Sequence, residues 1–280
     1  MKVVSRIEEL TSIITSLKSS KKTIGLVPTM GALHQGHLSL IEKSDSENSF
    51  SIVTIFVNPT QFDKKEDLIN YPSTLKEDLI LLEKSGCDLV FTPNASEIYE
   101  NNISPEVFTF EGLEHEMEGK HRNNHFDGVG TIVKKFFKIT KPDNAYFGEK
   151  DFQQLQIIRK MVSQEKMPLN VIGCPIFRED DGLAMSSRNI RLNKSERQAV
   201  PFIFKTLKQA ATKFSTQTIA EIKTWTEIQF NNHPALGLEY FEIADEATLQ
   251  AATKKQGDTK YRAFIAVYVN SIRLIDNISL

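Results

Sequence analysis

Short apolar runs separated by amphipathic segments are the feature that most constrains how this chain can fold. The runs lie at 23–27, 51–57, 89–92, 145–148 and 169–173. A strand that is apolar on both sides must be covered on both sides, and a parallel sheet between two layers of helices provides that cover. We therefore predict an α/β fold whose first part is a Rossmann-like, doubly wound parallel sheet.

The segments between these runs carry signals for helices. Ser5-Arg6-Ile7-Glu8 has the spacing of a capping box, and apolar residues recur behind it at helical spacing. Gly86 closes a helix predicted over 73–85, because glycine is common directly after a helix. Further helices are predicted over 130–140 and 152–164.

The pattern changes after about Phe177. Two helical segments and three strand-like runs follow: 194–213, 218–230, 238–243, 262–269 and 272–275. Helices followed by an antiparallel meander are typical of a separate α+β domain. We predict a Rossmann-like domain over residues 1–176 and a smaller C-terminal α+β domain over residues 177–280.

Composition excludes several classes of protein. The net charge of -2, with 25% charged residues, gives no basic surface of the kind that nucleic acid needs. Glu8 and Glu9 stand where a signal peptide would be apolar, and no apolar stretch approaches ~18 residues. The two cysteines, Cys87 and Cys174, fit a reducing compartment. The expectation is a soluble, cytoplasmic protein with no nucleic-acid or membrane partner.

Two histidines stand out in the stretch PTMGALHQGHLSL, residues 28–40. His34 and His37 are two of only six histidines, they follow an apolar run, and a helix can begin near Leu38. Residues three apart share one side of a helix's first turn, where free N–H groups favour an anion. Gly31 and Gly36 let a ligand approach the backbone. Two surface histidines near a turn would be the alternative, but the pair with its glycines favours a phosphate site.

The loops after the other apolar runs are informative, because ligands of doubly wound folds bind beyond the carboxyl ends of the strands. Unusual polar residues gather in five such stretches: MGALHQGH (30–37), NPTQF (58–62), HRNNHFDG (121–128), GEKDFQQ (148–154) and DGLAMSSRN (181–189).

Each of these stretches has a functional and an ordinary interpretation. Lys150 can bridge phosphate oxygens or belong to a solvated charge cluster at a helix start. Ser186, Ser187 and Arg188 can close over phosphates or form a polar linker. Amides at strand ends suit a substrate's hydroxyls and carboxylate, although surface amides are common. These amides are Asn58, Gln61 and Gln154.

Taken together and in this order, the stretches resemble the pantothenate synthetase (pantoate–β-alanine ligase) family. PTMGALHQGHLSL, VNPTQF, GEKDFQQL and DGLAMSSRN are similar to its signatures nearly letter for letter, and the likeness runs to about residue 192. The H-x-G-H element also resembles the wider nucleotidyltransferase superfamily. Two departures occur: Asn123-Asn124 replaces the Pro-Gly of many members, and Ala184 to Arg188 lacks the lysines of the related synthetase loop.

The resemblance implies an ATP-dependent ligase that joins pantoate to β-alanine through a pantoyl adenylate and releases AMP and pyrophosphate. It implies catalytic roles for His37, His34 and Lys150, with His37 as the proton donor. Implied ATP-binding residues are Met30, Gly31, Ala32, Leu33, His34, Gln35, Gly36, His37, Gly148, Glu149, Lys150, Asp151, Phe177, Met185, Ser186, Ser187 and Arg188.

Further implications concern the substrates, the metal and the assembly. Gln61 and Gln154 would hold pantoate, with Asn58 in support and Gln61 also near β-alanine. Domain 1–176 would bind nucleotide and pantoate, and domain 177–280 would act as a lid. Mg²⁺ would bridge ATP phosphates, with Asp78 as a protein-side ligand beside Glu77. A homodimer is implied as well.

Other functions remain open at this point. An adenylyl- or cytidylyltransferase of the same superfamily would release a nucleotide product. A nucleotide-sensing module would bind ATP without turnover. A tRNA-acting enzyme is disfavoured by the acidic net charge.

Overall fold

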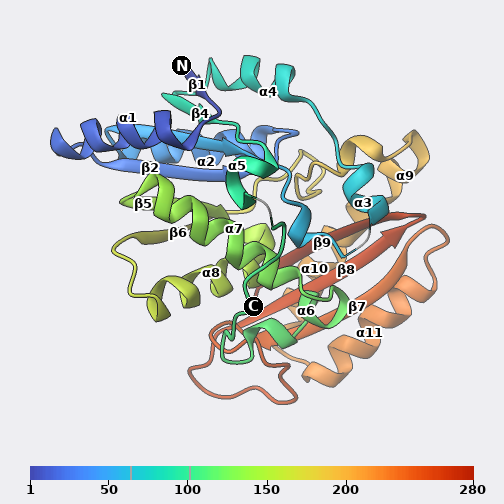
Figure 1. The fold of residues 1–280 in the computed structure, drawn as a ribbon. Helices are drawn as coiled ribbons and strands as arrows, with labels where there is room; N and C mark the ends of the chain where they lie inside the picture. Colours follow the sequence, from blue (N-terminus) through green and yellow to red (C-terminus); the bar gives the residue numbers. More distant parts are fainter. Residues whose placement is uncertain (64, 101) are drawn as a thin grey trace. The chain divides into compact units, whose positions relative to one another are not determined.

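A parallel sheet of six strands organises the first part of the computed structural model, which describes residues 1–63, 65–100 and 102–280 (Figure 1). In spatial order the described strands are β1 (Lys2–Val4), β4 (Leu89–Phe91), β3 (Phe50–Ile55), β2 (Ile24–Thr29), β5 (Asn144–Gly148) and β6 (Asn170–Cys174). Every pairing between them is parallel. The strand order reverses at β2 and β5, which is the switch point of a doubly wound sheet.

Helices cover both faces of this sheet, as runs that are apolar on both sides require. Val90 and Phe91 are consecutive in β4 and point to opposite faces. Val90 belongs to a buried cluster with residues of α2 (Gln35–Glu47), whereas the Phe91 ring lies 6.3 Å from Phe136 of α7 (His125–Thr140). The other helices of this part are α1 (Ile7–Ser19), α3 (Lys65–Ile69), α4 (Leu75–Leu82), α5 (Ala95–Tyr99) and α8 (Phe152–Gln164).

A second sheet is antiparallel and has the order β7 (Gly237–Asp245), β8 (Tyr261–Val269), β9 (Ile272–Ser279). Three helices pack their apolar residues against it: α9 (Lys194–Ala199), α10 (Pro201–Phe214) and α11 (Ile219–Asn231). The predicted α/β class, with a doubly wound parallel sheet and a smaller α+β part, is confirmed.

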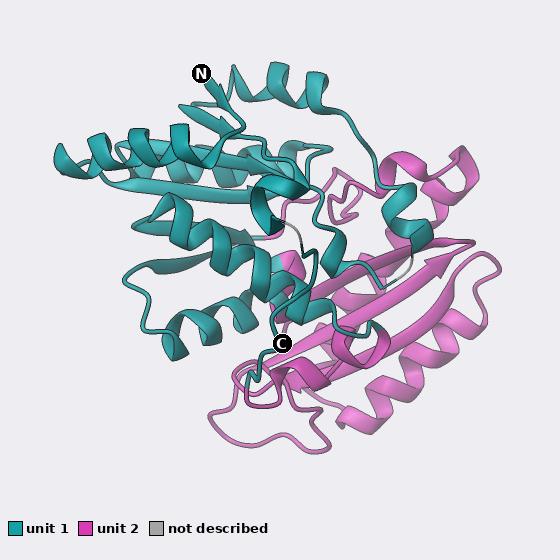
Figure 2. Cartoon of the chain, in the orientation of Figure 1, with its two compact units in different colours: residues 1–110, 122–149, 154–175 teal, residues 111–121, 150–153, 176–280 magenta. Residues whose placement is uncertain are grey.

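The chain divides into two compact units, drawn in different colours in Figure 2. Unit 1 comprises residues 1–110, 122–149 and 154–175, and unit 2 comprises 111–121, 150–153 and 176–280. Unit 2 thus includes a short helix, α6 (Glu118–His121), and the residues that directly follow Glu149. The domain boundary at residue 176 stays a prediction, and the compact units differ from it by these two inserted segments and by residue 176 itself, which falls in unit 2.

Some expected helix boundaries are wrong. The first helix begins after Arg6, and the N–H of Ile7 donates to the Glu97 carboxylate at 2.7 Å, so a distant acid caps this helix and the proposed capping box does not form. The single helix expected over 194–213 is two helices, since Pro201 starts a new one and lacks the N–H that a continuous helix needs.

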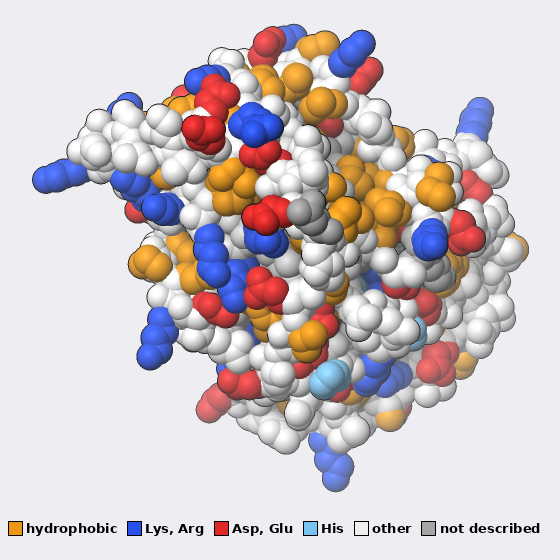
Figure 3. Space-filling view, in the orientation of Figure 1, with side chains coloured by type: hydrophobic (Ala, Val, Ile, Leu, Met, Phe, Trp, Pro, Cys, Tyr) orange, Lys and Arg blue, Asp and Glu red, His pale blue; other side chains and the backbone are white. Residues whose placement is uncertain are grey.

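The surface carries charges of both signs. On the face drawn in Figure 3, lysine and arginine side chains are interspersed with aspartate and glutamate, in keeping with a net charge of -2. No helix in the described part of the chain is both long and apolar enough to cross a membrane.

Both cysteines are buried thiols, and we predict that the folded protein protects them from alkylation. Burial raises the pKa of Cys87 to about 12 and that of Cys174 to about 11. The thiolate is the reactive form, so iodoacetamide at pH 8 should leave both cysteines unmodified until urea unfolds the chain, as counted by mass spectrometry.

The same shifts predict how stability depends on pH. Because both pKa values are raised on folding, their contribution is complete below the unfolded pKa of ~8.5 and is lost as the pH rises through about 11 to 12. In the alkylation experiment, rapid labelling of either thiol in the folded protein would contradict this burial.

Candidate active site

Several of the predicted site residues of unit 1 lie at the switch point of the sheet. The loop from Met30 follows β2 directly, Gly148 ends the neighbouring strand β5, and Glu149 comes next. Ligands of doubly wound folds bind beyond the carboxyl ends of the strands at such a point. The predicted phosphate loop therefore lies where the topology favours a ligand.

His34 and His37 form a stacked pair at the start of α2. His34 is the N-cap residue and His37 the third residue of the helix, and their ring centroids lie 4.0 Å apart. The backbone N–H of His34 donates to Nδ1 of His37 at 3.3 Å. Because Nδ1 of His37 accepts this bond, a neutral His37 ring carries its proton on Nε2. The helix begins at Gln35, three residues before the predicted start, and both rings lie at its N-terminus.

The turn before this helix is stabilised by a buried carboxylate. Gly31 and Ala32 both have left-handed backbone angles, with φ of 82° and 50°. Such an angle costs a residue with a side chain about 1–3 kcal/mol, so Ala32 needs compensating contacts. Asp78 provides them, since it accepts the N–H of Ala32 at 3.0 Å and that of Leu33 at 2.8 Å.

This geometry does not favour the metal role expected for Asp78. Asp78 is only 2% exposed, its two oxygens each accept a backbone N–H, and Thr74 also donates to it. A protein-held Mg²⁺ usually takes one or two carboxylates that are free to face the ion and its water. Among the described residues there is no group of three or more histidine, cysteine or acidic side chains that could hold a metal.

We predict that Asp78→Asn weakens the loop and leaves any dependence on added Mg²⁺ as it is in the parent protein. The amide replaces one of the two acceptor oxygens with a donor, so one backbone N–H loses its partner at a cost of about 1–3 kcal/mol. Urea unfolding should show this loss, and the response of the variant to added Mg²⁺ should match that of the parent protein. Exposed Glu77, varied to Gln, is the matched control. A variant of normal stability that needs more Mg²⁺ would instead make Asp78 a metal ligand.

Asn58 is the centre of a buried amide network in unit 1. Its Nδ2 donates to Oε1 of Gln61 at 3.2 Å and to the carbonyl of Gly128 at 3.1 Å, and its Oδ1 accepts from Tyr99 at 2.5 Å. The amide nitrogen of Gln61 approaches the sulfur of Met30 at 2.8 Å. The structure thus brings together Asn58, Gln61 and Met30, which were predicted as site residues from two separate loops.

The Asn123-Asn124 departure is compatible with this arrangement. Asn124 has φ of 56° and caps α7, a left-handed position that asparagine tolerates better than other residues with a side chain. The next residue, His125, lies 2.8 Å through Nδ1 from the carbonyl of Gln61, and 3.0 Å through Nε2 from Arg122. A carbonyl only accepts and a guanidinium only donates, so His125 is neutral with its proton on Nδ1.

Lys150 belongs to unit 2. It lies in a 3₁₀ turn, Glu149–Asp151, and its Nζ is 3.5 Å from the carboxylate of Asp151. Its backbone carbonyl accepts a hydrogen bond from the side chain of Asn277 at 2.9 Å. No local pattern indicates this contact, because Asn277 lies far along the chain in an ordinary strand.

The serine-containing loop also lies in unit 2. The N–H of Met185 donates to the carbonyl of Phe177 at 3.0 Å, which closes the base of the loop, while the Phe177 ring is exposed. Ser187 is buried, and the Ser186 hydroxyl accepts the N–H of Arg188 at 3.3 Å. Phe177 therefore contacts this loop through its backbone carbonyl.

Two adjacent glutamines differ in their surroundings. Gln153, which sequence reasoning passed over, is 4% exposed; it donates to the carbonyls of Leu113 and Glu116 and accepts the N–H of Glu118. These contacts fix the 111–121 segment within unit 2. Gln154, the predicted pantoate ligand, is half-buried in α8 of unit 1.

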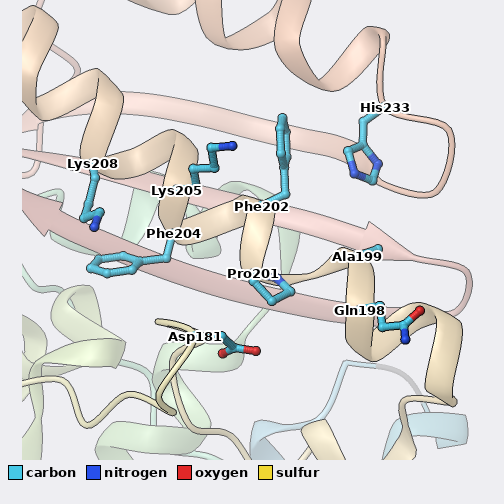
Figure 4. A pocket seen from close by; sticks show the side chains of 9 residues that line it. All are labelled: Asp181, Gln198, Ala199, Pro201, Phe202, Phe204, Lys205, Lys208 and His233. Carbon is cyan, nitrogen blue, oxygen red and sulfur yellow. The ribbon is translucent and has the colours of Figure 1, made fainter.

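Unit 2 also has an open hollow of about 450 Å³, shown in Figure 4. Phe202, Phe204, Lys205 and Lys208 of α10 line it together with His233, whose ring lies 4.6 Å from that of Phe202. Its lining includes none of the described residues that were predicted to bind substrate or nucleotide.

Comparison with known proteins connects these features to one family. The family model described as Pantoate-beta-alanine ligase matches residues 2–279. The pantothenate synthetase of Christiangramia forsetii is 52% identical over 281 residues, covering 100% of this chain and 99% of the relative. That of Bacteroides thetaiotaomicron is 47% identical over 278 residues, covering 99% and 98%.

Solved structures agree. The crystal structure of the pantothenate synthetase from Thermus thermophilus matches with a TM-score of 0.92 at 36% identity, covering 99% of each chain. A Francisella tularensis pantoate–β-alanine ligase, complexed with β,γ-ATP and β-alanine, matches with a TM-score of 0.83 at 35% identity, covering 100% of this chain and 97% of that one. This chain therefore belongs to the pantoate–β-alanine ligase family.

Proposed function

We propose that this protein condenses (R)-pantoate with β-alanine at the expense of ATP, giving pantothenate, AMP and pyrophosphate. The observation that carries the proposal is the stacked His34–His37 pair at the N-terminus of α2, directly after β2 at the sheet's switch point. Family membership supports it, since the match covers residues 2–279. The Francisella tularensis relative is described with an ATP compound and β-alanine, two of the three substrates proposed here.

The residues that we assign to ATP are described unit by unit. In unit 1 we assign it to the loop Met30 to His37 and to Gly148 and Glu149, and in unit 2 to Lys150, Asp151, the backbone of Phe177 and Met185 to Arg188. The N-terminal N–H groups of α2 and the two imidazoles suit phosphate oxygens, as does the ammonium of Lys150.

The first chemical step is attack of the pantoate carboxylate on the α-phosphate. Negative charge builds up on the phosphate oxygens, and pyrophosphate leaves. A donor that meets this charge only in the transition state accelerates the step. We assign that role to the Nε2 proton of His37, because its Nδ1 is already used by the backbone of His34. The amine of β-alanine then attacks the mixed anhydride, and AMP leaves.

Pantoate is assigned to the amide network and to Gln154. Asn58 is 1% and Gln61 is 9% exposed, so a hydroxyl or carboxylate bound there would be removed from water and would depend on these amides. We assign Gln61 to pantoate and to the neighbourhood of β-alanine, and Asn58 to holding Gln61 in place at 3.2 Å. The alternative function, an adenylyl- or cytidylyltransferase that releases a nucleotide product, is disfavoured because two glutamines suit a small hydroxy acid.

The metal is proposed to arrive with the nucleotide. Mg²⁺ is commonly bound through substrate phosphates with few protein ligands, and it would neutralise charge on the leaving pyrophosphate. A homodimer and a cytoplasmic location also stay predictions.

Pyrophosphate exchange tests the order of the chemistry. Adenylation requires ATP, the metal and pantoate, whereas the amine enters afterwards. The protein should therefore exchange labelled pyrophosphate into ATP when pantoate is present and β-alanine is absent. Adding β-alanine should then yield pantothenate and AMP.

Each rival function gives a different result in this assay. A nucleotidyltransferase would release a nucleotide product without any amine, and a nucleotide-sensing module would show no exchange. If exchange strictly requires β-alanine, an independent adenylation step does not occur and the two-step mechanism is wrong.

A further inference from the structure

Residue Asn277 of β9 holds the peptide that carries Lys150. The Asn277 side chain is 1% exposed and donates through Nδ2 to the carbonyl oxygen of Lys150 at 2.9 Å. Its Oδ1 accepts from Nη1 of Arg262, in β8, at 2.7 Å. The amide is therefore oriented from its oxygen side, and its nitrogen is directed at Lys150.

Arg262 also holds the segment 150–153 at a second residue. Its guanidinium lies 3.9 Å from the ring centroid of Phe152, two residues after Lys150, and its Nε donates to Glu246 at 2.8 Å. The Phe152 ring is also 6.0 Å from that of Phe264. The segment 150–153 is thus bound by the antiparallel sheet of unit 2.

The residue before Asn277 anchors the other predicted nucleotide segment of unit 2. The carboxylate of Asp276 accepts hydrogen bonds from both Nη1 and Nη2 of Arg178, at 2.6 and 2.9 Å. Arg178 also donates to the carbonyl of Gly182 and pairs in a short bridge with Ala184, directly before Met185. Bidentate pairs of this kind fix orientation as well as distance.

Consecutive residues of a strand point to opposite sides. In β9, Asn277 therefore holds the Lys150 peptide, and Asp276 holds Arg178 at the base of the serine-containing loop. We propose that Asn277 is a positioning residue that sets the placement of the Lys150 ammonium relative to the Met185–Arg188 loop. The inference rests on the proposed role of Lys150 in binding ATP phosphates. Asn277 lies near the C-terminal end of the described chain, and it would act on ATP binding only through the Lys150 peptide to which it is hydrogen-bonded.

Asn277→Asp tests this placement. The carboxylate keeps the size of the side chain and an acceptor for Arg262, but it cannot donate to the Lys150 carbonyl and repels it. A displacement of ~1 Å can cost as much as 10²-fold, so we expect kcat/KM for ATP in pyrophosphate exchange to fall at least ~10-fold. The KM for pantoate should change by less than ~2-fold. If this variant does not fold, Asn277→Ala removes both the donor to the Lys150 carbonyl and the acceptor for Arg262 without adding charge.

A double-mutant cycle separates positioning from simple loss of stability. If Asn277 acts through Lys150, adding Asn277→Asp to Lys150→Ala should change kcat/KM by less than ~2-fold. Thr226→Val, which removes a buried hydroxyl from α11 of the same unit, is the control and should leave kcat/KM for ATP unchanged.

The results separate the positioning role of Asn277 from the proposed contact of Lys150 with ATP phosphates. Multiplicative effects of the two substitutions, or normal activity of Asn277→Asp beside an impaired Lys150→Ala, would overturn the positioning role alone. Normal activity of Lys150→Ala would overturn the proposed phosphate contact of Lys150, and the role of Asn277 with it.

Discussion

Replacing His37 with alanine should lower the rate of pantoyl-adenylate formation by ~10²–10³-fold while the protein stays folded. The imidazole Nε2 proton is proposed to meet charge that develops on the α-phosphate, so its loss affects the transition state more than the bound substrate. Pyrophosphate exchange, measured with saturating ATP and pantoate, gives this rate directly. We expect the KM values for ATP and pantoate to change much less than kcat.

His37 also accepts the N–H of His34 at the helix start, so a control must separate catalysis from capping. His37→Gln provides it, since glutamine is a natural residue at the third position of a helix and can accept the same N–H. It should restore stability but not activity. Exposed His115, varied to Ala, should leave both unchanged.

The neighbouring His34→Ala should have a similar effect, and the double variant should be little worse than either single one, because both rings serve one phosphate group. Near-normal turnover in folded His37→Ala would remove this residue from the mechanism.

Replacing Gly128 with alanine should disrupt the pantoate pocket that we propose around Asn58 and Gln61. A Cβ at this position would lie 2.3 Å from the carbonyl oxygen of Thr60 and 2.7 Å from Cα of Gln61. These are backbone atoms, which cannot turn away as a side chain can, so α7 and the 58–61 turn must separate. We expect stability to fall by about 1–3 kcal/mol. The Gly128 carbonyl, which orients Asn58 at 3.1 Å, would move with the helix.

For activity, a shift of this size should lower kcat/KM for pantoate by as much as ~10²-fold. Gly130→Ala is the matched control, two residues further along the same helix. Its Cβ would meet only the aromatic rings of Phe108 and Phe110, at 3.1 to 3.2 Å. A small loss for Gly130→Ala beside a large one for Gly128→Ala would locate the effect in the 58–61 turn. If the two variants lost kcat/KM for pantoate equally, the effect would come from disturbing the helix and not from the 58–61 turn.

The main sheet could be predicted from the sequence because burial on both faces leaves a clear pattern. Each buried run became a strand within one or two residues of its predicted position. β1 was missed, since Lys2–Val4 is short and two of its three residues are exposed. It is a strand only because β4 offers it an edge to pair with.

Candidate site residues could be chosen from the sequence for a similar reason. Residue types at strand ends indicated His34, His37, Asn58 and Gln61 as candidates, and the structure arranges them in a stacked pair and a hydrogen-bonded pair. The metal role of Asp78 is a prediction that comes from the family resemblance, which implies a metal near the phosphates. That its oxygens hold a strained turn depends on contacts 45 and 46 residues apart, which no local pattern records.

The way unit 2 is assembled affects whether the protein can be divided. Arg273 of β9 is largely buried and makes two hydrogen bonds to Glu118, at 2.7 Å each, and Glu118 lies in a segment flanked in sequence on both sides by unit 1. A fragment that begins at residue 176 would lack this acid and the Phe152 ring, and would leave a buried cation without one of its carboxylates. We therefore expect residues 176–280 to fold poorly by themselves and to be rescued when the missing chain is supplied in trans.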